Sequence, residues 1–105
     1  MYQLRIYTLR TVEALEDYAT VHWPRHIPSL RAFGVTAHGI WTDQDAHAHR
    51  LLALISYPEG ADPAGVTAAY MAGPEFKADM EGFDVSNIIH VEELLLDPTA
   101  ASPLS

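Results

Sequence analysis

The chain contains no cysteine among its 105 residues. Disulfide bridges, thiolate nucleophiles, cysteine zinc sites and iron–sulfur clusters are therefore excluded. No apolar run approaches the roughly 20 residues that a membrane-spanning helix needs, and the N-terminal MYQLRIYTLR lacks the basic-then-apolar order of a signal peptide. We expect a cytoplasmic protein.

Basic residues are also scarce, since 6 Lys and Arg stand against 14 Asp and Glu and give a formal net charge of −8. This charge repels phosphate groups, and the basic residues form no run, so nucleic acids and anionic membranes are poor candidates for partners. The sequence also lacks a glycine-rich phosphate loop, a dinucleotide fingerprint and a local Ser-His-Asp signature. Hydrolase, kinase and nicotinamide-dependent functions are therefore without support.

Hydrophobic residues make up 49% of the chain, which suits one domain with one core. We place this domain at residues 1–96 and expect residues 97–105 to form a C-terminal arm or a disordered tail. A small domain with many apolar strand residues often completes its core by pairing with a second copy, so we expect a homodimer.

Hydrophobic periodicity predicts the element order β-α-β-β-α-β. Alternation predicts a first strand, and helical spacing from a cap at Thr11 to a stop at Gly34 predicts a long helix with an internal irregularity. The predicted strands are residues 2–10, 35–42, 50–57 and 87–96, and two short helical pieces are predicted at 64–71 and 75–80. This order indicates an α+β, ferredoxin-like fold, in which a four-stranded antiparallel sheet carries its helices on one face.

The sheet face without helices needs a cover of its own, because we expect Tyr7 to lie there together with either a set of leucines or Ile55 from the third strand, which is apolar on both faces. Two such sheets packed face to face across a two-fold axis would form a dimeric barrel. The cavity between or within its halves is where we expect a small-molecule substrate to bind.

Five segments carry a family resemblance. They are the opening YQLRIYTLRTVEALEDY, the GIWT of the second strand, the ISYPEGADP turn, the GPEFKADM helix and the terminal ELLLDPTAASPL. In this order and spacing they resemble the NIPSNAP family of the dimeric α+β barrel superfamily over nearly the whole chain. The His-x-Pro of residues 26–28 is also similar to the EthD-like branch. The resemblance implies a homodimeric barrel, within a superfamily of isomerases, cofactor-free oxygenases, polyketide cyclases and dehydratases, heme proteins and members without known activity.

The segment HWPRHIP, residues 22–28, places two histidines in the long helix. His22 and His26 fall on its apolar stripe, so we expect them to point at the sheet. Pro24 and Pro28 each remove a backbone donor, and carbonyls near Thr20 and Pro24 are therefore available to accept a hydrogen bond from an imidazole.

Three interpretations of these histidines stay open. They are buried structural residues of a kinked helix, or a metal pair completed by His90 or Glu92, or a general acid or base centred on His26. We favour a site without a metal or cofactor, because the resemblance brings no metal with it.

The first strand supplies further polar candidates. If Gln3, Arg5 and Tyr7 face the barrel interior, Arg5 offers a cationic fork for an enolate or carboxylate, and Tyr7 offers a hydroxyl donor. Alternatively, Arg5 pairs with Glu92 or Glu93 on a neighbouring strand.

The other strands supply weaker candidates. His90 and Glu92 share a side of the fourth strand and suit an acid–base dyad. His38 lies on the second strand, and we expect Trp41 to form a core or cavity wall. The acidic residues of the second helical region are expected on a solvated face: Glu75, Asp79 and Glu81.

Together with the family resemblance, these observations predict a cofactor-independent enzyme of secondary metabolism. Its substrate is a small, largely apolar, enolisable metabolite of polyketide type, and the reaction is an isomerisation, cyclisation, dehydration or oxygenation. His26 moves the proton while Arg5 and Tyr7 stabilise negative charge on oxygen. The further predicted catalytic residues are His22, His90 and Glu92, and the predicted substrate-binding residues are Trp41, His38 and Gln3. The alternatives are a non-catalytic binding or interaction module of the NIPSNAP type and a heme or metal protein.

Overall fold

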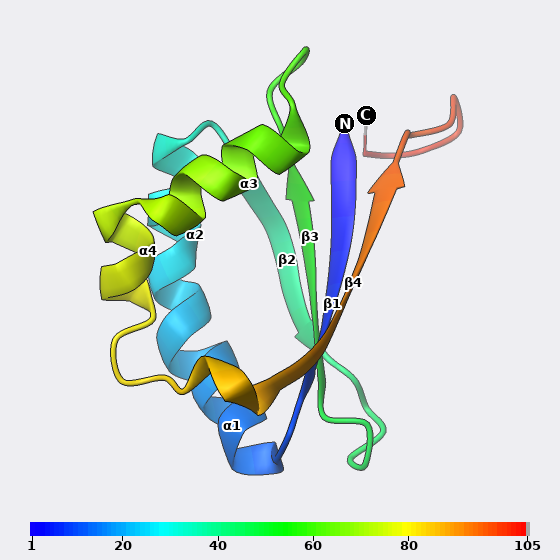
Figure 1. Ribbon diagram of the computed structural model, residues 1–105. Coiled ribbons are helices and arrows are strands. Elements are labelled where there is room, and N and C mark those ends of the chain that lie inside the picture. Colours follow the sequence, from blue (N-terminus) through cyan, green and yellow to red (C-terminus); the bar gives the residue numbers. More distant parts are fainter. Residues whose placement is uncertain (105) are drawn as a thin grey trace.

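The computed structural model describes residues 1–104 and confirms the ferredoxin-like α+β fold. Its strands are β1 (Tyr2–Leu9), β2 (Thr36–Thr42), β3 (Arg50–Ser56) and β4 (Ile88–Leu96). Its helices are α1 (Val12–Asp17), α2 (Trp23–Ala32), α3 (Pro63–Ala72) and α4 (Pro74–Asp79), with a π-helical turn at Tyr18–His22 and a 3-10 turn at Val85–Asn87. The strands form one antiparallel sheet in the order β2-β3-β1-β4, and all helices lie on one face of it (Figure 1).

The ends of the long helical region follow from local sequence. Thr11 begins it, because its hydroxyl oxygen accepts a hydrogen bond from the Ala14 N–H at 3.1 Å. Gly34 ends it with a φ of +82°, a left-handed conformation that other residues adopt with strain. The expected irregularity lies between these ends as the complete π turn that joins α1 to α2.

The prediction that Tyr7 lies on the face without helices was wrong, and of the two alternatives for the third strand, that face carries the leucines and not Ile55. Tyr7 and Ile55 lie on the same face. Both are buried under the helices, and the Tyr7 ring packs edge-on against Tyr18 and Trp23 at centroid distances of 5.3 and 6.1 Å. Because β3 is apolar on both faces, its sequence gives no sign of which set of residues meets the helices. Alternation along β1 then places Gln3 and Arg5 on the same helix-covered face as Tyr7.

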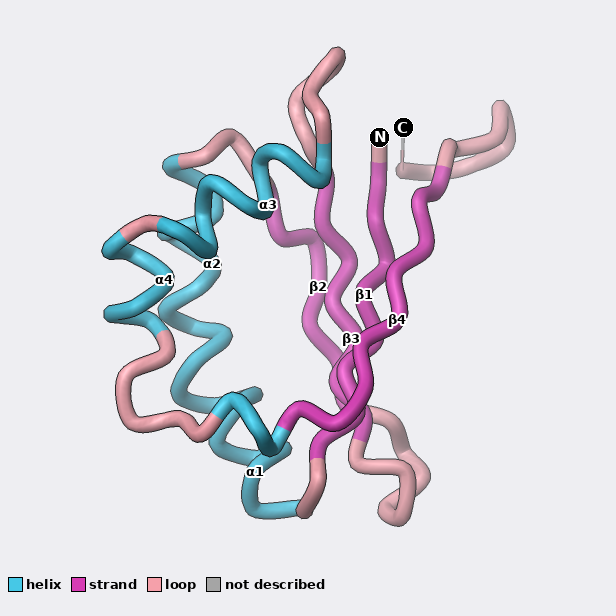
Figure 2. Tube along the Cα trace, viewed as in Figure 1, coloured by secondary structure: helices cyan, strands magenta, loops and turns pink. Residues whose placement is uncertain are grey.

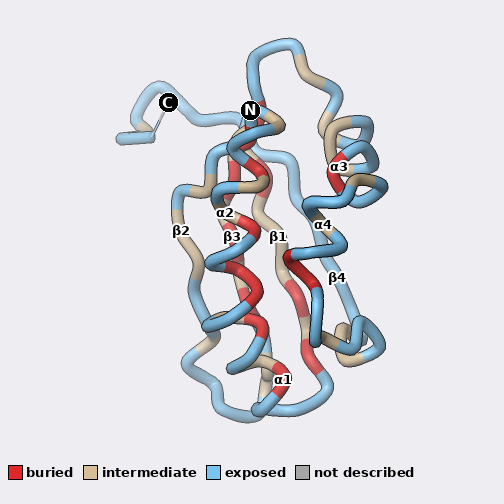
Figure 3. Tube along the Cα trace, turned by 90° about the vertical axis from the view of Figure 1, so that its left-hand side faces the viewer, coloured by how far each residue is buried: buried red, intermediate tan, exposed pale blue. Residues whose placement is uncertain are grey.

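The opposite face of the sheet, which we call the open face, carries no helix (Figure 2). Strand register places apolar residues from all four strands there: Leu4, Ile6, Trp41, Leu52, Leu54, Leu94 and Leu96. Trp41 is 53% exposed and Leu94 43%. Buried residues concentrate in the strands and helix faces that meet each other, whereas β4 is exposed along most of its length (Figure 3).

The last residues continue beyond β4 on the open side of the sheet (Figure 1). Residues 97–104 form a turn in which the Ser102 N–H donates to the Thr99 carbonyl at 3.0 Å. They border a shallow groove with Tyr2, Leu54 and Leu96. Within residues 1–104, no helix combines the length and apolar character needed to cross a bilayer.

Candidate functional site

The π turn shapes one wall of the site. In this turn the Trp23 N–H donates to the Tyr18 carbonyl, five residues earlier. In an α-helix, two side chains five residues apart point about 140° away from each other, whereas the wider π turn brings Tyr18 and Trp23 close to the same face. Pro24 lacks the N–H that an α-helix would use in this region. The result is an aromatic wall in which the Tyr18, Trp23 and His26 rings contact one another.

A cavity of about 270 Å³ lies between this wall and the sheet. Its lining residues are Arg5, Tyr7, Tyr18, Trp23, His26, Leu30, Thr67, Tyr70, Met71, Phe76, Met80, Val85, Ile88 and Val91. The cavity therefore brings together Arg5, Tyr7 and His26, three of the predicted catalytic residues, within a single chain. Most of the remaining lining is apolar, which suits a small hydrophobic ligand.

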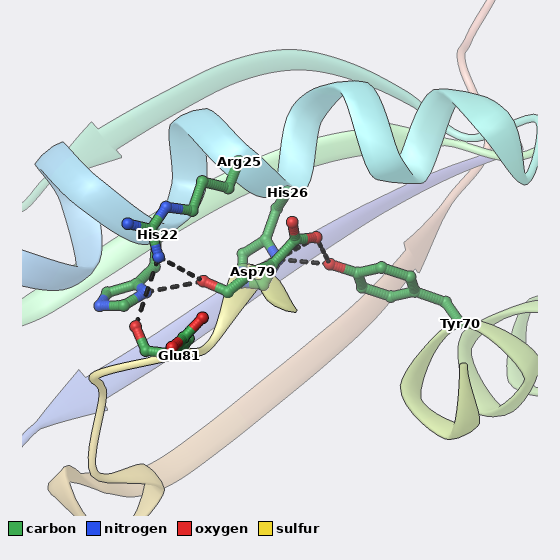
Figure 4. A network of polar contacts seen from close by, with 6 residues as sticks. All are labelled: His22, Arg25, His26, Tyr70, Asp79 and Glu81. Carbon is green, nitrogen blue, oxygen red and sulfur yellow. Dashed lines mark hydrogen bonds and ion pairs between the residues drawn. The ribbon is translucent and has the colours of Figure 1, made fainter. Parts of the chain in front are cut away.

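His26 is anchored by residues of α3 and α4 (Figure 4). Its Nδ1 is hydrogen-bonded to the Tyr70 hydroxyl and lies 3.5 Å from Asp79 Oδ2. The Tyr70 hydroxyl in turn donates to Asp79 Oδ2 at 2.6 Å. The His26 ring also stacks on Phe76, with centroids 6.0 Å apart. The imidazole is therefore fixed in orientation at the cavity wall.

This network determines which nitrogen of His26 carries a proton. Tyr70 has one hydroxyl proton and gives it to the Asp79 carboxylate, so the Tyr70 oxygen accepts and His26 Nδ1 must donate. Burial lowers the pKa of His26 to about 4, although Asp79 opposes that shift. His26 is therefore neutral near pH 7, with a proton on Nδ1 and none on Nε2.

Asp79 also holds the second histidine. Its backbone carbonyl, at the end of α4, accepts hydrogen bonds from His22 Nδ1 at 2.8 Å and Arg25 Nη1 at 3.5 Å (Figure 4). Carbonyls at a helix C-terminus lack helical partners, and basic side chains commonly satisfy them. His22 is 3% exposed and lies behind the cavity wall, where its ring packs on Phe83. The prediction that carbonyls near Thr20 or Pro24 bind the imidazoles was wrong, because the partners come from α3 and α4.

Arg5 brings a positive charge to the cavity. Its Nη2 donates to Glu93 Oε1 at 3.0 Å, which is the predicted pairing with the neighbouring strand, and its Cζ lies 5.4 Å from the centre of the Tyr7 ring. Burial lowers the pKa of Arg5, but Tyr7 and Glu93 outweigh it and the pKa stays above its usual value. Burial raises the pKa of Tyr7 and of Tyr18, so both hydroxyls remain protonated donors.

Gln3 does not line this cavity but a second groove beside it. Its Nε2 donates to Glu93 at 3.3 Å, and its Oε1 accepts from the Tyr57 hydroxyl at 3.1 Å. Thr67 lines both the groove and the cavity, so the two spaces are neighbours. Gln3 therefore supports the strand that carries Arg5.

Four of the predicted site residues are on the open face, away from the cavity. Register pairs His90 with Thr8 and Glu92 with Ile6, which places both on that face. The other two are His38, which bonds the Ser56 hydroxyl at 2.7 Å, and Trp41, whose ring covers Gly39. Trp41 is therefore neither core nor cavity wall within the chain.

The predicted third ligands of a metal site, His90 and Glu92, therefore lie on the other side of the sheet from His22 and His26. No group of three or more His, Cys, Asp or Glu side chains in residues 1–104 is arranged to hold a metal ion.

Tyr70 and Trp23 were not predicted as site residues, and the prediction that Asp79 lies on a solvated face was wrong. Asp79 is 7% exposed. It follows Phe76 by three residues and precedes Met80 by one, so helical spacing does place it on the buried side of α4. Its acidic neighbours Glu75 and Glu81 obscured that signal, and both are exposed.

The fold and site define a class of protein: a ferredoxin-like domain whose cavity lies between its sheet and its helices. The chain belongs to the NIPSNAP family, whose sequence model matches residues 2–103.

Solved structures of the same family share the fold. An uncharacterized NIPSNAP domain protein from Burkholderia xenovorans has a TM-score of 0.75 and 18% identity, with 97% of each chain covered. A NIPSNAP family protein with unknown function from Agrobacterium tumefaciens has a TM-score of 0.77 and 20% identity, covering 99% of this chain and 92% of that chain.

One curated protein is similar in sequence. The leucine–tRNA ligase of Phenylobacterium zucineum is 32% identical over 79 residues, which is 75% of this chain and 8% of the ligase. Because the chain spans only this small part of the ligase, the match carries no argument for aminoacylation.

Proposed function

We propose that the protein is a cofactor-independent enzyme that moves a proton on a small, largely apolar, enolisable metabolite bound in the cavity. The observation that carries this proposal is the network of His26, Tyr70 and Asp79, which leaves His26 Nε2 unprotonated at the cavity wall. Imidazole in this form is a general base.

The chemistry follows from the groups that share the cavity. His26 Nε2 takes a proton from a carbon next to a substrate carbonyl, and the electron pair of the broken C–H bond moves onto the carbonyl oxygen. The Asp79 carboxylate, reached through Tyr70, stabilises the imidazolium that forms. The Arg5 guanidinium, with Tyr7 beside it, stabilises the enolate oxygen. Return of the proton to a different carbon gives isomerisation, and attack by the enolate carbon gives cyclisation.

Hydrogen exchange tests this proposal without knowledge of the natural substrate. β-Tetralone is a neutral two-ring ketone with an acidic C–H beside its carbonyl. In deuterium oxide the wild-type protein should accelerate exchange of that hydrogen, measured by proton NMR. His26→Ala should lower the protein-dependent rate about 100-fold, the loss typical of a missing general base. His47→Ala, a change in the exposed loop between β2 and β3, is the matched control and should exchange as the wild type does. Equal rates in the two variants would refute the assignment of His26.

A second candidate is a non-catalytic binding module of the NIPSNAP type. It is favoured by the apolar lining and by burial, which lowers the pKa of His26 to about 4 and makes it a weak base. Saturable binding of β-tetralone without faster exchange in wild-type protein would select this candidate.

We further propose that the open face pairs with the same face of a second copy. Its exposed apolar residues, such as Trp41 and Leu94, support this, since a two-fold interface needs a self-complementary surface. Sedimentation should give a dimer for the wild type and for Val12→Lys, a change on an exposed helix position, and a monomer for Leu54→Lys. A monomeric wild type at high concentration would exclude the pairing.

A further inference from the structure

Asp79 is held at two points by two different parts of the chain (Figure 4). Its carboxylate accepts a hydrogen bond from the Tyr70 hydroxyl on α3 at 2.6 Å. Its backbone carbonyl accepts one from His22 Nδ1, at the end of the π turn, at 2.8 Å. Both contacts are buried, and among residues 1–104 those that line the cavity do not include His22. Any effect of His22 on the site must therefore pass through Asp79.

His22 is the closer of the two donors to the Asp79 carbonyl. Arg25 Nη1 reaches the same oxygen at 3.5 Å, which is the upper limit for a hydrogen bond, and it also lies 3.3 Å from the Glu81 carbonyl. Because a carbonyl oxygen only accepts, His22 Nδ1 carries a proton and donates it. The His22 ring packs on Phe83, with centroids 4.9 Å apart. The donor and the ring of His22 therefore make separate contacts, and substitution can separate them.

The position of the Asp79 carboxylate decides where the Tyr70 proton points. The Tyr70 hydroxyl contacts both the carboxylate and His26 Nδ1, and the charged carboxylate is the stronger acceptor. An aspartate side chain has only two torsions, so a shift of its backbone moves the carboxylate with it. A shift of about 1 Å would lengthen the bond from Tyr70 beyond hydrogen-bond distance. Tyr70 would then donate to His26 Nδ1, and the single imidazole proton would sit on Nε2.

We propose that His22 is a positioning residue that holds the Asp79 backbone so that the carboxylate stays bonded to Tyr70. The Tyr70 proton is then unavailable to His26, and His26 Nε2 stays unprotonated. The two histidines are four residues apart and face the same helices, α3 and α4, so one holds the backbone of Asp79 and the other meets its side-chain network. This inference rests on the proposed function, because it explains how the same base is kept in its active form.

Two substitutions separate the donor of His22 from its ring. His22→Phe keeps a ring against Phe83 and removes the donor, whereas His22→Asn removes the ring and keeps an N–H close to the Nδ1 position. Nitrogen-15 NMR at pH 7 should show the His26 proton on Nδ1 in the wild type and in His22→Asn, and on Nε2 in His22→Phe. His47→Phe makes the same replacement in an exposed loop and should leave His26 as in the wild type.

The reverse pattern, with a changed His26 in His22→Asn and an unchanged one in His22→Phe, would assign His22 a packing role and overturn the proposal. An Nδ1 proton on His26 in both variants would overturn it as well. If His22→Phe does not fold, His22→Asn decides alone: the wild-type His26 signals support a role for the donor, and altered signals contradict it.

Exchange of β-tetralone gives a second measurement. His22→Phe should lower kcat at least about tenfold, since the general base is lost in most molecules, and should leave KM unchanged, since His22 does not line the cavity. A raised KM with the wild-type kcat would contradict the proposal. If the wild type does not accelerate exchange, the proposed function fails, and the NMR comparison still decides the role of His22. Wild-type exchange that is unaffected by His22→Phe would instead refute only the role of His22.

Discussion

The two faces of the sheet differ in a way that is unusual for a half-covered antiparallel sheet. The face under the helices contains the polar side chains Gln3 and Arg5, with His26 and Asp79 across from them. The open face, which helices do not cover, is rich in half-buried and exposed leucines and carries Trp41. A sheet that functions alone normally shows the reverse order, with apolar residues inside and polar residues in water.

This difference separates two roles. Burying charged and titratable groups is costly unless each has a partner, so their concentration under the helices indicates a site where chemistry or recognition occurs. An exposed apolar surface has no comparable use within one chain and indicates contact with another surface. The predictions below test whether the two faces really differ in this way.

The largest effect is expected from adjacent β3 residues on opposite faces. Ile55 is 1% exposed and packs under the helices, so Ile55→Ala should lower the free energy of unfolding by about 2–5 kcal/mol. Leu54→Ala, on the half-buried open face, should cost less in dilute protein and more as the concentration rises, because association covers that face. Urea denaturation at two protein concentrations measures both. Equal costs at every concentration would remove the distinction between the faces.

Acid should destabilise the helix-covered face through His26. Its pKa is about 4 in the folded protein, against the ordinary histidine value of 6.5 in the unfolded chain, so unfolding takes up a proton between these two pH values. This contribution to stability, on the order of 3 kcal/mol, is complete above pH 6.5 and is lost as the pH falls toward 4. His26→Gln should flatten the dependence of unfolding free energy on pH in this window. A variant with the wild-type slope would show that His26 does not carry it.

Tyr70→Phe tests whether the Tyr70 hydroxyl positions His26 or whether Tyr70 only packs against its neighbours. The change removes the hydroxyl between His26 and Asp79 and leaves the ring, so it should cost about 1–3 kcal/mol of stability. As a positioning residue, Tyr70 should also affect the pH profile of β-tetralone exchange, whose acid limb should shift in the variant. Thr42→Val, which removes an exposed hydroxyl at the end of β2 and away from the cavity, is the control and should keep the wild-type profile. Identical profiles in all three proteins would assign Tyr70 a packing role alone.

The smallest effect is expected at the rim of the cavity. The Arg5–Glu93 pair has one partly exposed partner, so Glu93→Gln should change stability by at most about 1 kcal/mol. It should nevertheless allow naphthoate, a two-ring aromatic carboxylate, to bind more tightly in the cavity, since Arg5 loses its competing carboxylate. Calorimetry of the wild type and the variant measures this, and unchanged naphthoate affinity would show that Glu93 does not exclude anions.

Much of the fold was predictable because hydrophobic periodicity and turn residues specify it locally. Thr11 and Gly34 marked the ends of the long helix, and alternation identified β1. The identity of the covered face was not predictable, since β3 is apolar on both sides and only the packed helices decide between them. The β3 pattern therefore could not show that Tyr7 lies on the helix-covered face.

The candidate site was partly predictable for a similar reason. His26 and Arg5 stood out as polar residues in apolar patterns, and both line the cavity. Tyr70 and Asp79 act through contacts between α3, α4 and α2, which are distant in sequence. The π turn that places Trp23 beside Tyr18 depends on backbone hydrogen bonding, which residue spacing in an α-helix does not reveal.

The protonation state of His26 tests the central claim most directly. Nitrogen-15 NMR of the imidazole rings distinguishes a protonated nitrogen from an unprotonated one. For His26 at pH 7 we predict a protonated Nδ1 and an unprotonated Nε2. In Tyr70→Phe the Nδ1–H should lose its hydrogen bond to the Tyr70 hydroxyl, and the Nδ1 signal should change. A proton on Nε2 instead would mean that Tyr70 donates to His26, and the cavity would then have no base.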